Sequence, residues 1–260
     1  MRYGATKVEW VLFWTYFICS SMAITVGYHR LFAHATFKTS PLVKFFLLFF
    51  GATTFEQSAL KWASQHRQHH QFTDTPQDPY NIRNGFWYAH VGWILFWKHR
   101  MNYNNVLDLK RSKLVMHQHR WYSLWSVGGG MVLPMLIGYA IGRPLGAFVL
   151  VLCLRLVLVM HSAFFINSYA HLFGAKNYDG SVSARDHWLG AVLTNGEGYH
   201  NFHHKFPNDY RNGIKWYHWD PTKWFICLLS IPGLASDLKR TPEYLIRAAA
   251  EPAQSEYISA

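Results

Sequence analysis

The stretch SQHRQHHQF at residues 64–72 contains three histidines, His66, His69 and His70. The same H-x-x-H-H spacing returns in HNFHH at residues 200–204. On a helix, residues i, i+3 and i+4 share one face, so each motif is predicted to direct three imidazoles into one space. Two such motifs favour a helical protein built around a cluster of histidines.

A third cluster, HRLFAH at residues 29–34, adds a more widely spaced pair of histidines. Neutral imidazoles gathered in one place are typically metal ligands, because crowded imidazolium cations would repel one another. Eight ligands are too many for one tetrahedral zinc ion and suit two ions of higher coordination, such as iron. The zinc-protease motif H-E-x-x-H and a pair of E-x-x-H motifs, typical of soluble di-iron bundles, are both absent. The eight clustered histidines are His29, His34, His66, His69, His70, His200, His203 and His204.

Apolar segments separate the histidine clusters. The 260-residue chain is 50% hydrophobic and 18% aromatic, with 12 Trp and 15 Tyr, which is typical of a protein at a membrane interface. A mean hydropathy of −0.05 indicates that much of the chain lies outside lipid. We therefore expect one all-α domain over residues 1–260, an integral-membrane helical protein with a polar helical body. The expected parts are spans at 8–28, 127–142 and 145–166, an in-plane helix at 41–55, and the body at 56–126 and 167–260.

The basic residues indicate how the chain lies in a membrane. The formal net charge is +11, with 12 Lys and Arg in residues 29–126, 9 in 167–260 and four elsewhere. By the positive-inside rule, both polar regions and their histidines belong on the cytoplasmic side. Nucleic acid is not an expected partner, because the basic residues form no run. Arg155 lies inside the last span, where a charge needs a partner that the sequence does not reveal.

Long signatures around the three clusters resemble those of the integral-membrane fatty acid desaturases, most closely the acyl-CoA (stearoyl-CoA, delta-9) type. They are AITVGYHRLFAH at 23–34, HHQFTDTPQDPYNIRNGFWYAHVGW at 69–93 and NGEGYHNFHHKFPNDYRNG at 195–213. The resemblance covers about residues 20–230. It implies a cytoplasmic helical domain housing a His-rich di-iron centre.

The resemblance also implies a ninth histidine ligand, because NSYAHLFG at 167–174 resembles the family's Asn-x-x-x-His element. In that element the asparagine reaches a metal through water. One iron would then take His29, His34, His66, His70 and His204. The other would take His69, His171, His200 and His203, with Asn167 in its outer sphere. His66 and His70, one helical turn apart, should thus face one iron while His69 turns to the other.

The implied reaction is the O2-dependent removal of two hydrogens from a saturated C16 or C18 acyl chain, giving a cis double bond, usually at carbon 9. The electron donor must be a separate protein, a ferredoxin or a b-type cytochrome with its reductase, because the chain has no fused haem domain and its three cysteines form no C-x-x-C. Side chains expected at the substrate are Gln57, Trp62 and Lys98, with Lys61 and Arg100 nearby. Acids expected to support the metal ligands are Asp74, Asp78, Asp186 and Glu197.

Some positions depart from the acyl-CoA desaturases and leave the substrate and the reaction open. Residues 1–28 hold one span where the family has two before its first histidine cluster, and Ala163-Phe164 replaces a Thr-Trp pair. Ser64 and Gln65 replace an Arg-Asp pair that helps to hold CoA, so a lipid-linked acyl substrate stays open. A fatty acyl hydroxylase with the same histidines and a non-catalytic membrane metal-binding protein also stay open.

Overall fold

The computed structural model describes residues 4–98 and 101–258, and this part of the chain is mostly helical, as predicted. Its two short strands, β1 (Lys38–Thr39) and β2 (Ala235–Ser236), pair antiparallel. Four segments are π-helical: η1 (Ala23–Ala33), η3 (Tyr88–Gly92), η5 (Leu124–Val132) and η6 (Ala147–Leu154). Three are 3₁₀-helical: η2 (Ile82–Asn84), η4 (Tyr103–Val106) and η7 (Tyr169–His171). The α-helices are α1 (Lys7–Met22), α2 (Pro41–Ala52), α3 (Ala59–Phe72), α4 (Trp93–Phe96), α5 (Leu107–Lys110), α6 (Lys113–Arg120), α7 (Leu133–Ala140), α8 (Pro144–Gly146), α9 (Arg155–Asn167), α10 (Trp188–Leu193), α11 (His200–Lys205), α12 (Pro221–Ser230) and α13 (Glu243–Ile258).

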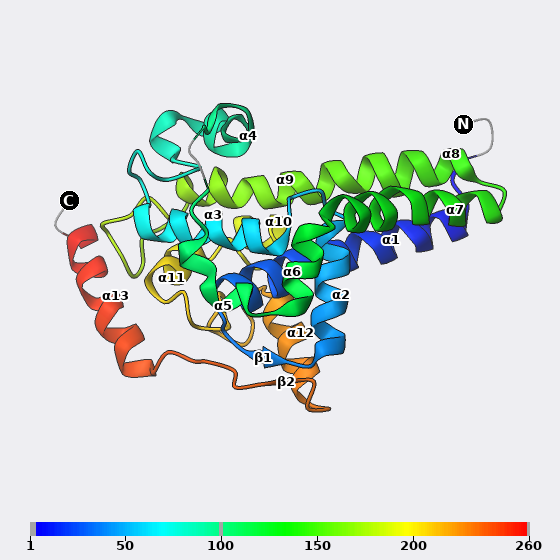
Figure 1. Ribbon diagram of the computed structural model, residues 1–260. Helices are drawn as coiled ribbons and strands as arrows, with labels where there is room; N and C mark the ends of the chain where they lie inside the picture. The colour runs from blue at the N-terminus through cyan, green and yellow to red at the C-terminus, as the bar shows by residue number, and fades with distance from the viewer. Residues whose placement is uncertain (1–3, 99–100, 259–260) are drawn as a thin grey trace.

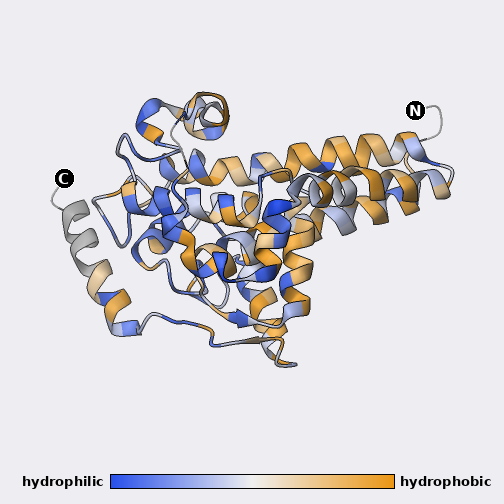
Figure 2. Cartoon of the chain, viewed as in Figure 1, coloured by the Kyte–Doolittle hydropathy of each residue, from blue (hydrophilic) through white to orange (hydrophobic). Residues whose placement is uncertain are grey.

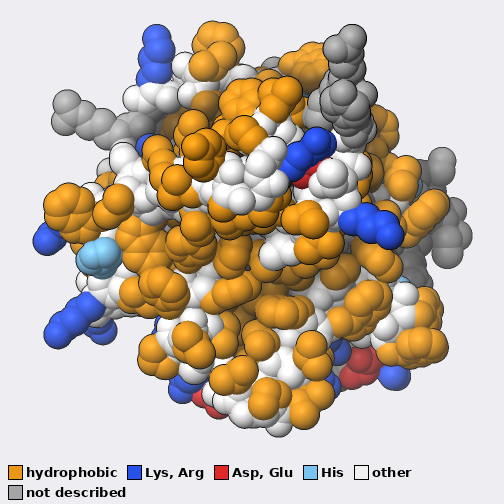
Figure 3. Space-filling view, turned by 90° about the vertical axis from the view of Figure 1, so that its right-hand side faces the viewer, with side chains coloured by type: hydrophobic (Ala, Val, Ile, Leu, Met, Phe, Trp, Pro, Cys, Tyr) orange, Lys and Arg blue, Asp and Glu red, His pale blue; other side chains and the backbone are white. Residues whose placement is uncertain are grey.

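Two continuous helices in the described residues are long and apolar enough to cross a membrane, Lys7–Ala33 and Pro144–His171. A third crossing is formed if Lys113–Arg120 and Leu124–Ala140, bent by 73° relative to each other, count as one span. Figure 1 shows α1 and α7 running towards one end of the molecule beside η6, the first part of the helix that continues into α9. That end is mostly hydrophobic in Figure 2, and hydrophobic side chains cover most of the face that Figure 3 shows. The apolar helices overlap the predicted segments at 8–28, 127–142 and 145–166, and the helices Lys7–Ala33 and Pro144–His171 extend beyond the first and last of these segments.

The start of the helix α2 is capped by the residue before it. The Ser40 side chain accepts a hydrogen bond from the amide of Val43, and Pro41 occupies the first turn, where a missing N–H costs nothing. The helix has 12 residues, fewer than a bilayer crossing requires. In Figure 1 it runs across the direction of α1 and α9. The predicted in-plane segment at 41–55 is therefore a short apolar helix set against the long ones.

Arg155 is completely buried between the long helices and finds its partners among oxygen atoms without charge. Its Nη1 donates to Ser20 Oγ at 3.0 Å and to the Thr53 carbonyl at 3.0 Å. Its Nη2 donates to the Gly130 carbonyl at 3.4 Å, and its Nε donates to the Val151 carbonyl at 2.7 Å. This one side chain therefore joins α1, the end of α2, η5 and its own helix.

Candidate metal centre

The helix α3 presents its histidines in two directions. His66 and His70 lie one turn apart, with their Nε2 atoms 3.1 Å from each other. The His69 Nε2 instead lies 3.2 Å from that of His204. The helix starts at Ser58, whose side chain accepts from the amide of Lys61. In the structure this trio is therefore divided between two groups of histidines, as the resemblance implied.

The wider spacing of His29 and His34 is explained by a π-helical turn. The His34 amide donates to the His29 carbonyl five residues earlier, at 3.1 Å, so the helix is wound more widely than an α-helix. This winding brings residues i and i+5 onto one face. The His34 Nε2 lies 2.9 Å from that of His66, and the His29 Nε2 lies 2.9 Å from that of His203. Both histidines therefore join the group that contains His66.

Nine histidines form two compact groups. Within each group the possible ligand atoms all lie within 4.8 Å of one another. The assignment of His203 and His204 in the sequence-based ligand sets was wrong: His203 lies with His29, and His204 lies with His69. Both residues are on α11, a six-residue helix whose rotation the sequence does not fix. The first group is His29, His34, His66, His70 and His203, and the second is His69, His171, His200 and His204.

The donor set fits metal ions. The Nε2 atoms of His66 and His203 each lie 2.9–3.1 Å from two other Nε2 atoms, so their lone pairs converge on one space. Burial, and then the neighbouring imidazoles, lower the pKa of His34, His66, His70, His200, His203 and His204 well below the ordinary value. Neutral imidazoles with converging lone pairs repel one another unless a cation lies between them.

Two buried carboxylates hold histidines directly, and one acts through a hydroxyl. Oδ1 of Asp78 lies 2.8 Å from Nδ1 of His69, and Oε2 of Glu197 lies 2.8 Å from Nδ1 of His29. Such contacts orient a ring so that its other nitrogen faces the metal. The third carboxylate, Asp74, accepts from the hydroxyl of Ser183, which lies 2.6 Å from Nδ1 of His171. The fourth predicted acid, Asp186, has a different role and accepts from the amides of Asn201 and Phe202 at the start of α11.

Glu197 is itself part of a buried charge network. Its Oε1 accepts from Arg30 at 3.0 Å, and Arg30 also donates to both carboxylate oxygens of Asp220. Burial alone would raise the pKa of Glu197, but His29 and Arg30 together hold it below the ordinary value. The carboxylate beside His29 is therefore negatively charged and rigidly placed.

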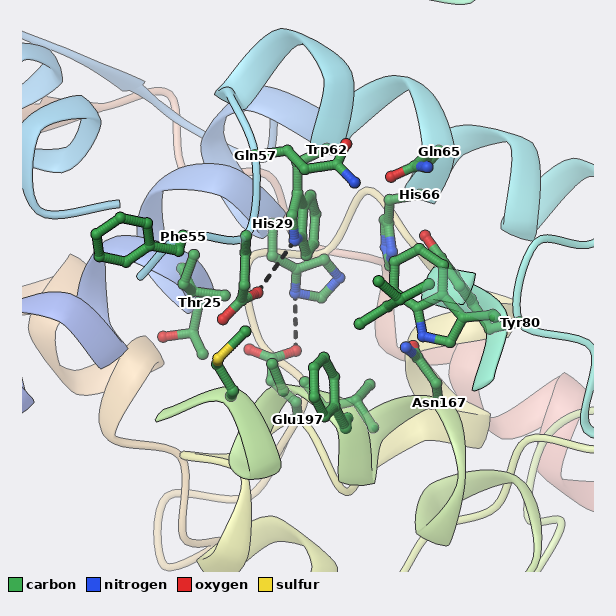
Figure 4. Close-up of a pocket in the computed structure, with 18 residues that line it drawn as sticks. Thr25, His29, Phe55, Gln57, Trp62, Gln65, His66, Tyr80, Asn167 and Glu197 are labelled. Carbon is green, nitrogen blue, oxygen red and sulfur yellow. Dashed lines mark hydrogen bonds and ion pairs between the residues drawn. The ribbon is translucent and has the colours of Figure 1, made fainter. Parts of the chain in front are cut away.

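A largely apolar cavity opens beside the first histidine group. Figure 4 shows Trp62 and Gln57 above His29, with Phe55 at one end and Tyr80 and Asn167 at the other. The cavity wall comes from η1, the turn after α2, the helix α3 and the helix α9. Its lining residues are Ile24, Thr25, His29, Phe55, Glu56, Gln57, Trp62, Gln65, His66, Tyr80, Trp93, Ile94, Met160, Ala163, Phe164, Ile166, Asn167 and Glu197.

Comparisons with known proteins give the family. A model of the fatty acid desaturase family matches residues 9–225. The chain belongs to the fatty acid desaturase family. It is 43% identical over 231 residues to the "Probable acyl-CoA desaturase" of Schizosaccharomyces pombe, covering 88% of this chain and 48% of that protein. It is 41% identical to acyl-CoA desaturase 1 of Saccharomyces cerevisiae (90% and 46% covered) and 37% identical to stearoyl-CoA desaturase 2 of Rattus norvegicus (95% and 72% covered). The chain thus spans about half the length of the two yeast relatives.

The structure of this desaturase-family chain brings only some of the predicted substrate residues together. Gln57 and Trp62 line the cavity, and so does Asn167, which the resemblance implied in the outer sphere of the second iron. Lys98 is exposed and, like Lys61, is not among the residues that line it. Arg100 lies outside the described residues.

The positions that depart from the acyl-CoA relatives lie at or near the cavity. Ala163, Phe164 and Gln65 line it. Ser64 is buried, and its hydroxyl donates to the Asn105 side chain at 2.8 Å and to the Asn102 carbonyl at 3.1 Å. A hydroxyl that is satisfied in this way, inside the protein, does not offer the charge of an arginine, the residue that the resemblance implied at this position.

Sequence reasoning missed one acidic residue at the cavity, Glu56. Its Oε1 is buried without a hydrogen-bond partner among the described residues, and its Oε2 accepts from Trp62 Nε1 at 3.4 Å. Burial raises the pKa of Glu56 to about 8, although the hydrogen bond from Trp62 opposes this. The only sequence signal was an acid at the end of an apolar segment.

Proposed function

We propose that the chain is an O2-dependent di-iron fatty acyl desaturase that inserts a cis double bond into a saturated acyl chain. The observation that carries the proposal is the pair of histidine groups, nine buried or half-buried imidazoles with converging nitrogens, beside an apolar cavity. Two irons bound there would supply, with O2, the oxidising power that removing hydrogen from an unactivated methylene requires. The names of the relatives, acyl-CoA and stearoyl-CoA desaturases, support the same reaction.

The residues of the first group would hold one iron, and those of the second group the other, with Asn167 near the second. Asp78 and Glu197 would keep His69 and His29 oriented. The cavity would bind the acyl chain, since Ile24, Phe55 and Phe164 offer it an apolar wall. Trp62 stacks on the His66 ring at 4.8 Å, which places cavity wall and metal ligand in direct contact. An acyl chain in this cavity would exclude water from the space beside the irons.

The substrate we propose is a saturated C16 or C18 acyl-CoA, desaturated at carbon 9. The relatives support CoA as the carrier, whereas Ser64 and Gln65 give CoA fewer charged contacts than an Arg-Asp pair would. A lipid-linked acyl chain is the second candidate substrate, and the presence of Ser64 and Gln65 favours it. The electron donor would be a ferredoxin or a b-type cytochrome with its reductase.

We propose that the apolar helices cross a membrane and that the histidine groups face the cytoplasm. The excess of Lys and Arg in residues 29–126 and 167–260 supports this orientation. The exposed apolar residues of α2, Leu42, Phe45 and Phe46, would rest against lipid.

The test is a desaturation assay on the purified chain in lipid bilayers, with reductase, electron carrier and O2. Stearoyl-CoA and a stearoyl phospholipid are supplied in parallel, and the products are identified by mass spectrometry. A stearoyl-CoA-derived product with one double bond supports the proposal. A hydroxylated product would identify a hydroxylase. Turnover of the phospholipid alone would show that the acyl chain is carried by a lipid and not by CoA. Iron bound without O2-dependent turnover of either substrate would leave a metal-binding protein.

A further inference from the structure

A row of aromatic side chains leads from the surface to the second histidine group. Trp216 is 85% exposed, and its ring centroid lies 5.6 Å from that of Tyr217. The Tyr217 ring lies 5.2 Å from that of His218, which stacks on Tyr199 at 4.7 Å with 15° between the planes. Tyr199 is joined by one peptide bond to His200, a member of the second group. We call these four side chains, Trp216, Tyr217, His218 and Tyr199, the aromatic row.

A buried glycine keeps the row continuous. A Cβ atom on Gly213 would lie 2.7 Å from Cβ of His218 and 3.1 Å from Cε2 of Tyr199. The backbone of Gly213 has no left-handed conformation, so space alone excludes a larger residue there. A side chain at this position would push the two stacked rings apart.

Other aromatic side chains that contact the histidine groups lie on the side of the acyl cavity. Tyr80 packs on His69 and on Trp93, and Trp62 packs on His29 and His66. These three aromatic residues line the acyl cavity and would be covered by a bound acyl chain. None of the four residues of the aromatic row is among the residues that line this cavity. The row therefore reaches the second group from outside the space that the substrate would occupy.

We propose that the aromatic row is the electron-entry path and that the external one-electron carrier protein docks over Trp216. The proposal rests on the proposed function. In each turnover the carrier gives two electrons one at a time, solvent gives two protons and the acyl chain gives two hydrogen atoms. Together these reduce one O2 to two waters. Electron transfer slows steeply with distance and is faster through closely packed π-systems than across gaps. A carrier docked on the surface would therefore transfer electrons fastest where such a row begins.

The charge at the start of the row suits an acidic carrier. The ammonium of Lys215 lies 5.7 Å from the Tyr217 ring centroid, and Lys215 is exposed. The whole chain carries a formal charge of +11. An acidic face on the carrier would be attracted to this surface, and the attraction would weaken as salt is added.

The experiment compares Trp216→Leu with a matched control, Trp219→Leu. Trp219 belongs to the same loop, is 45% exposed and packs on Trp224 instead of the aromatic row. Each iron-loaded variant in lipid is mixed with reduced carrier, and the oxidation of the carrier is followed by stopped-flow absorbance. In parallel, each variant is reduced chemically, freed of reductant and exposed to O2, and the product of one turnover is measured.

We expect Trp216→Leu to slow carrier oxidation by at least about tenfold, a barrier increase of about 1.4 kcal/mol, with an unchanged product yield after chemical reduction. Trp219→Leu should match the wild type in the rate of carrier oxidation and in the product yield. Tyr199→Leu should behave like Trp216→Leu, while Tyr199→Phe, which keeps the ring, should stay close to wild type. Equal slowing in both Trp variants, or no slowing in Trp216→Leu, overturns the proposal. A wild type without product after chemical reduction instead contradicts the proposed function.

A second readout needs no metal. In the metal-free protein, the bound carrier should protect Trp216 from photo-oxidation, measured by peptide mass spectrometry, and should leave Trp224 unprotected. Equal oxidation of Trp216 with and without the carrier would overturn the docking position.

Discussion

Oε2 of Glu197 lies 2.8 Å from Nδ1 of His29, while Oε1 of the same carboxylate accepts from Arg30 at 3.0 Å. His29 and Arg30 are neighbours in HRLFAH at residues 29–34, and Glu197 comes three residues before HNFHH at residues 200–204. The contact therefore joins two clusters that are distant in the sequence, and all three side chains are buried. It also fixes which nitrogen of His29 faces the first group.

Glu197→Gln should weaken iron binding at the first group, because an amide lacks the negative charge that holds His29 and Arg30. We expect a loss of about 10–100-fold in affinity, the usual effect of removing a group that supports a metal ligand. The measurement is iron retention during competition with a graded series of chelators. Asp237→Asn, at an exposed carboxylate paired with Lys38, is the matched control and should retain iron as the wild type does. Equal retention in both variants would show that the carboxylate does not support the site.

Arg155→Met should destabilise the helix bundle. It leaves the buried carbonyls of Thr53 and Gly130 without the guanidinium, at a cost of about 1–3 kcal/mol for each orphaned group. Arg155→Lys, which keeps a charge but loses the planar fork, should fall between Met and wild type. Thermal unfolding in detergent gives the order of Tm values. Arg247→Met removes an exposed arginine and should leave Tm unchanged; a similarly small shift for Arg155→Met would contradict a stabilising role for the buried guanidinium.

Glu56 should make the protein less stable as pH rises. Its pKa is about 8 in the folded state against 4.5 as the ordinary value, so between these pH values the folded state binds more protons than the unfolded state. Stability then falls with rising pH across that window. Glu56→Gln should flatten the decline in Tm between about pH 5 and 8. The exposed Glu243→Gln is the control, and an unchanged slope in Glu56→Gln would show that this carboxyl is not protonated in the folded state.

Sequence predicted those parts of the site that depend on helical periodicity. The spacing i, i+3 and i+4 predicts that His66, His69 and His70 share one face of α3, whereas their division between two irons was implied by the resemblance; in the structure His66 and His70 lie in one group and His69 in the other. The apolar runs likewise predicted the long helices, because the length of an apolar run in the sequence is enough to recognise such a helix. Spacing alone did not place the pair His29 and His34, which only the resemblance assigned to the group of His66 and His70, because no local pattern predicts the π-helical turn that joins them.

Other features depend on tertiary contacts that no local pattern carries. The exchange of His203 and His204 reflects the rotation of α11, which Asp186 fixes from another segment. The partners of Arg155 are hydroxyl and carbonyl oxygens from three other segments, and carbonyls are present at every residue of a sequence. Lys98 was expected at the acyl or phosphate end of the substrate, and the structure leaves it exposed and not among the residues that line the cavity.

His203→Gln and His204→Gln should affect different irons, because the two residues belong to different groups. Mössbauer spectra of the two variants, each loaded with iron-57, should each keep one of the two wild-type signals, and not the same one. Loss of the same signal in both would contradict the division into two groups.

The most direct test of the central claim is a single turnover of the iron-loaded, chemically reduced chain with stearoyl-CoA and O2. Bound iron is counted in the same sample. We predict about two irons per chain, one for each histidine group, and a product lighter than the substrate by two hydrogens that forms only when O2 is present. An iron-loaded chain that gives no product, or gives a hydroxylated one, would contradict the account.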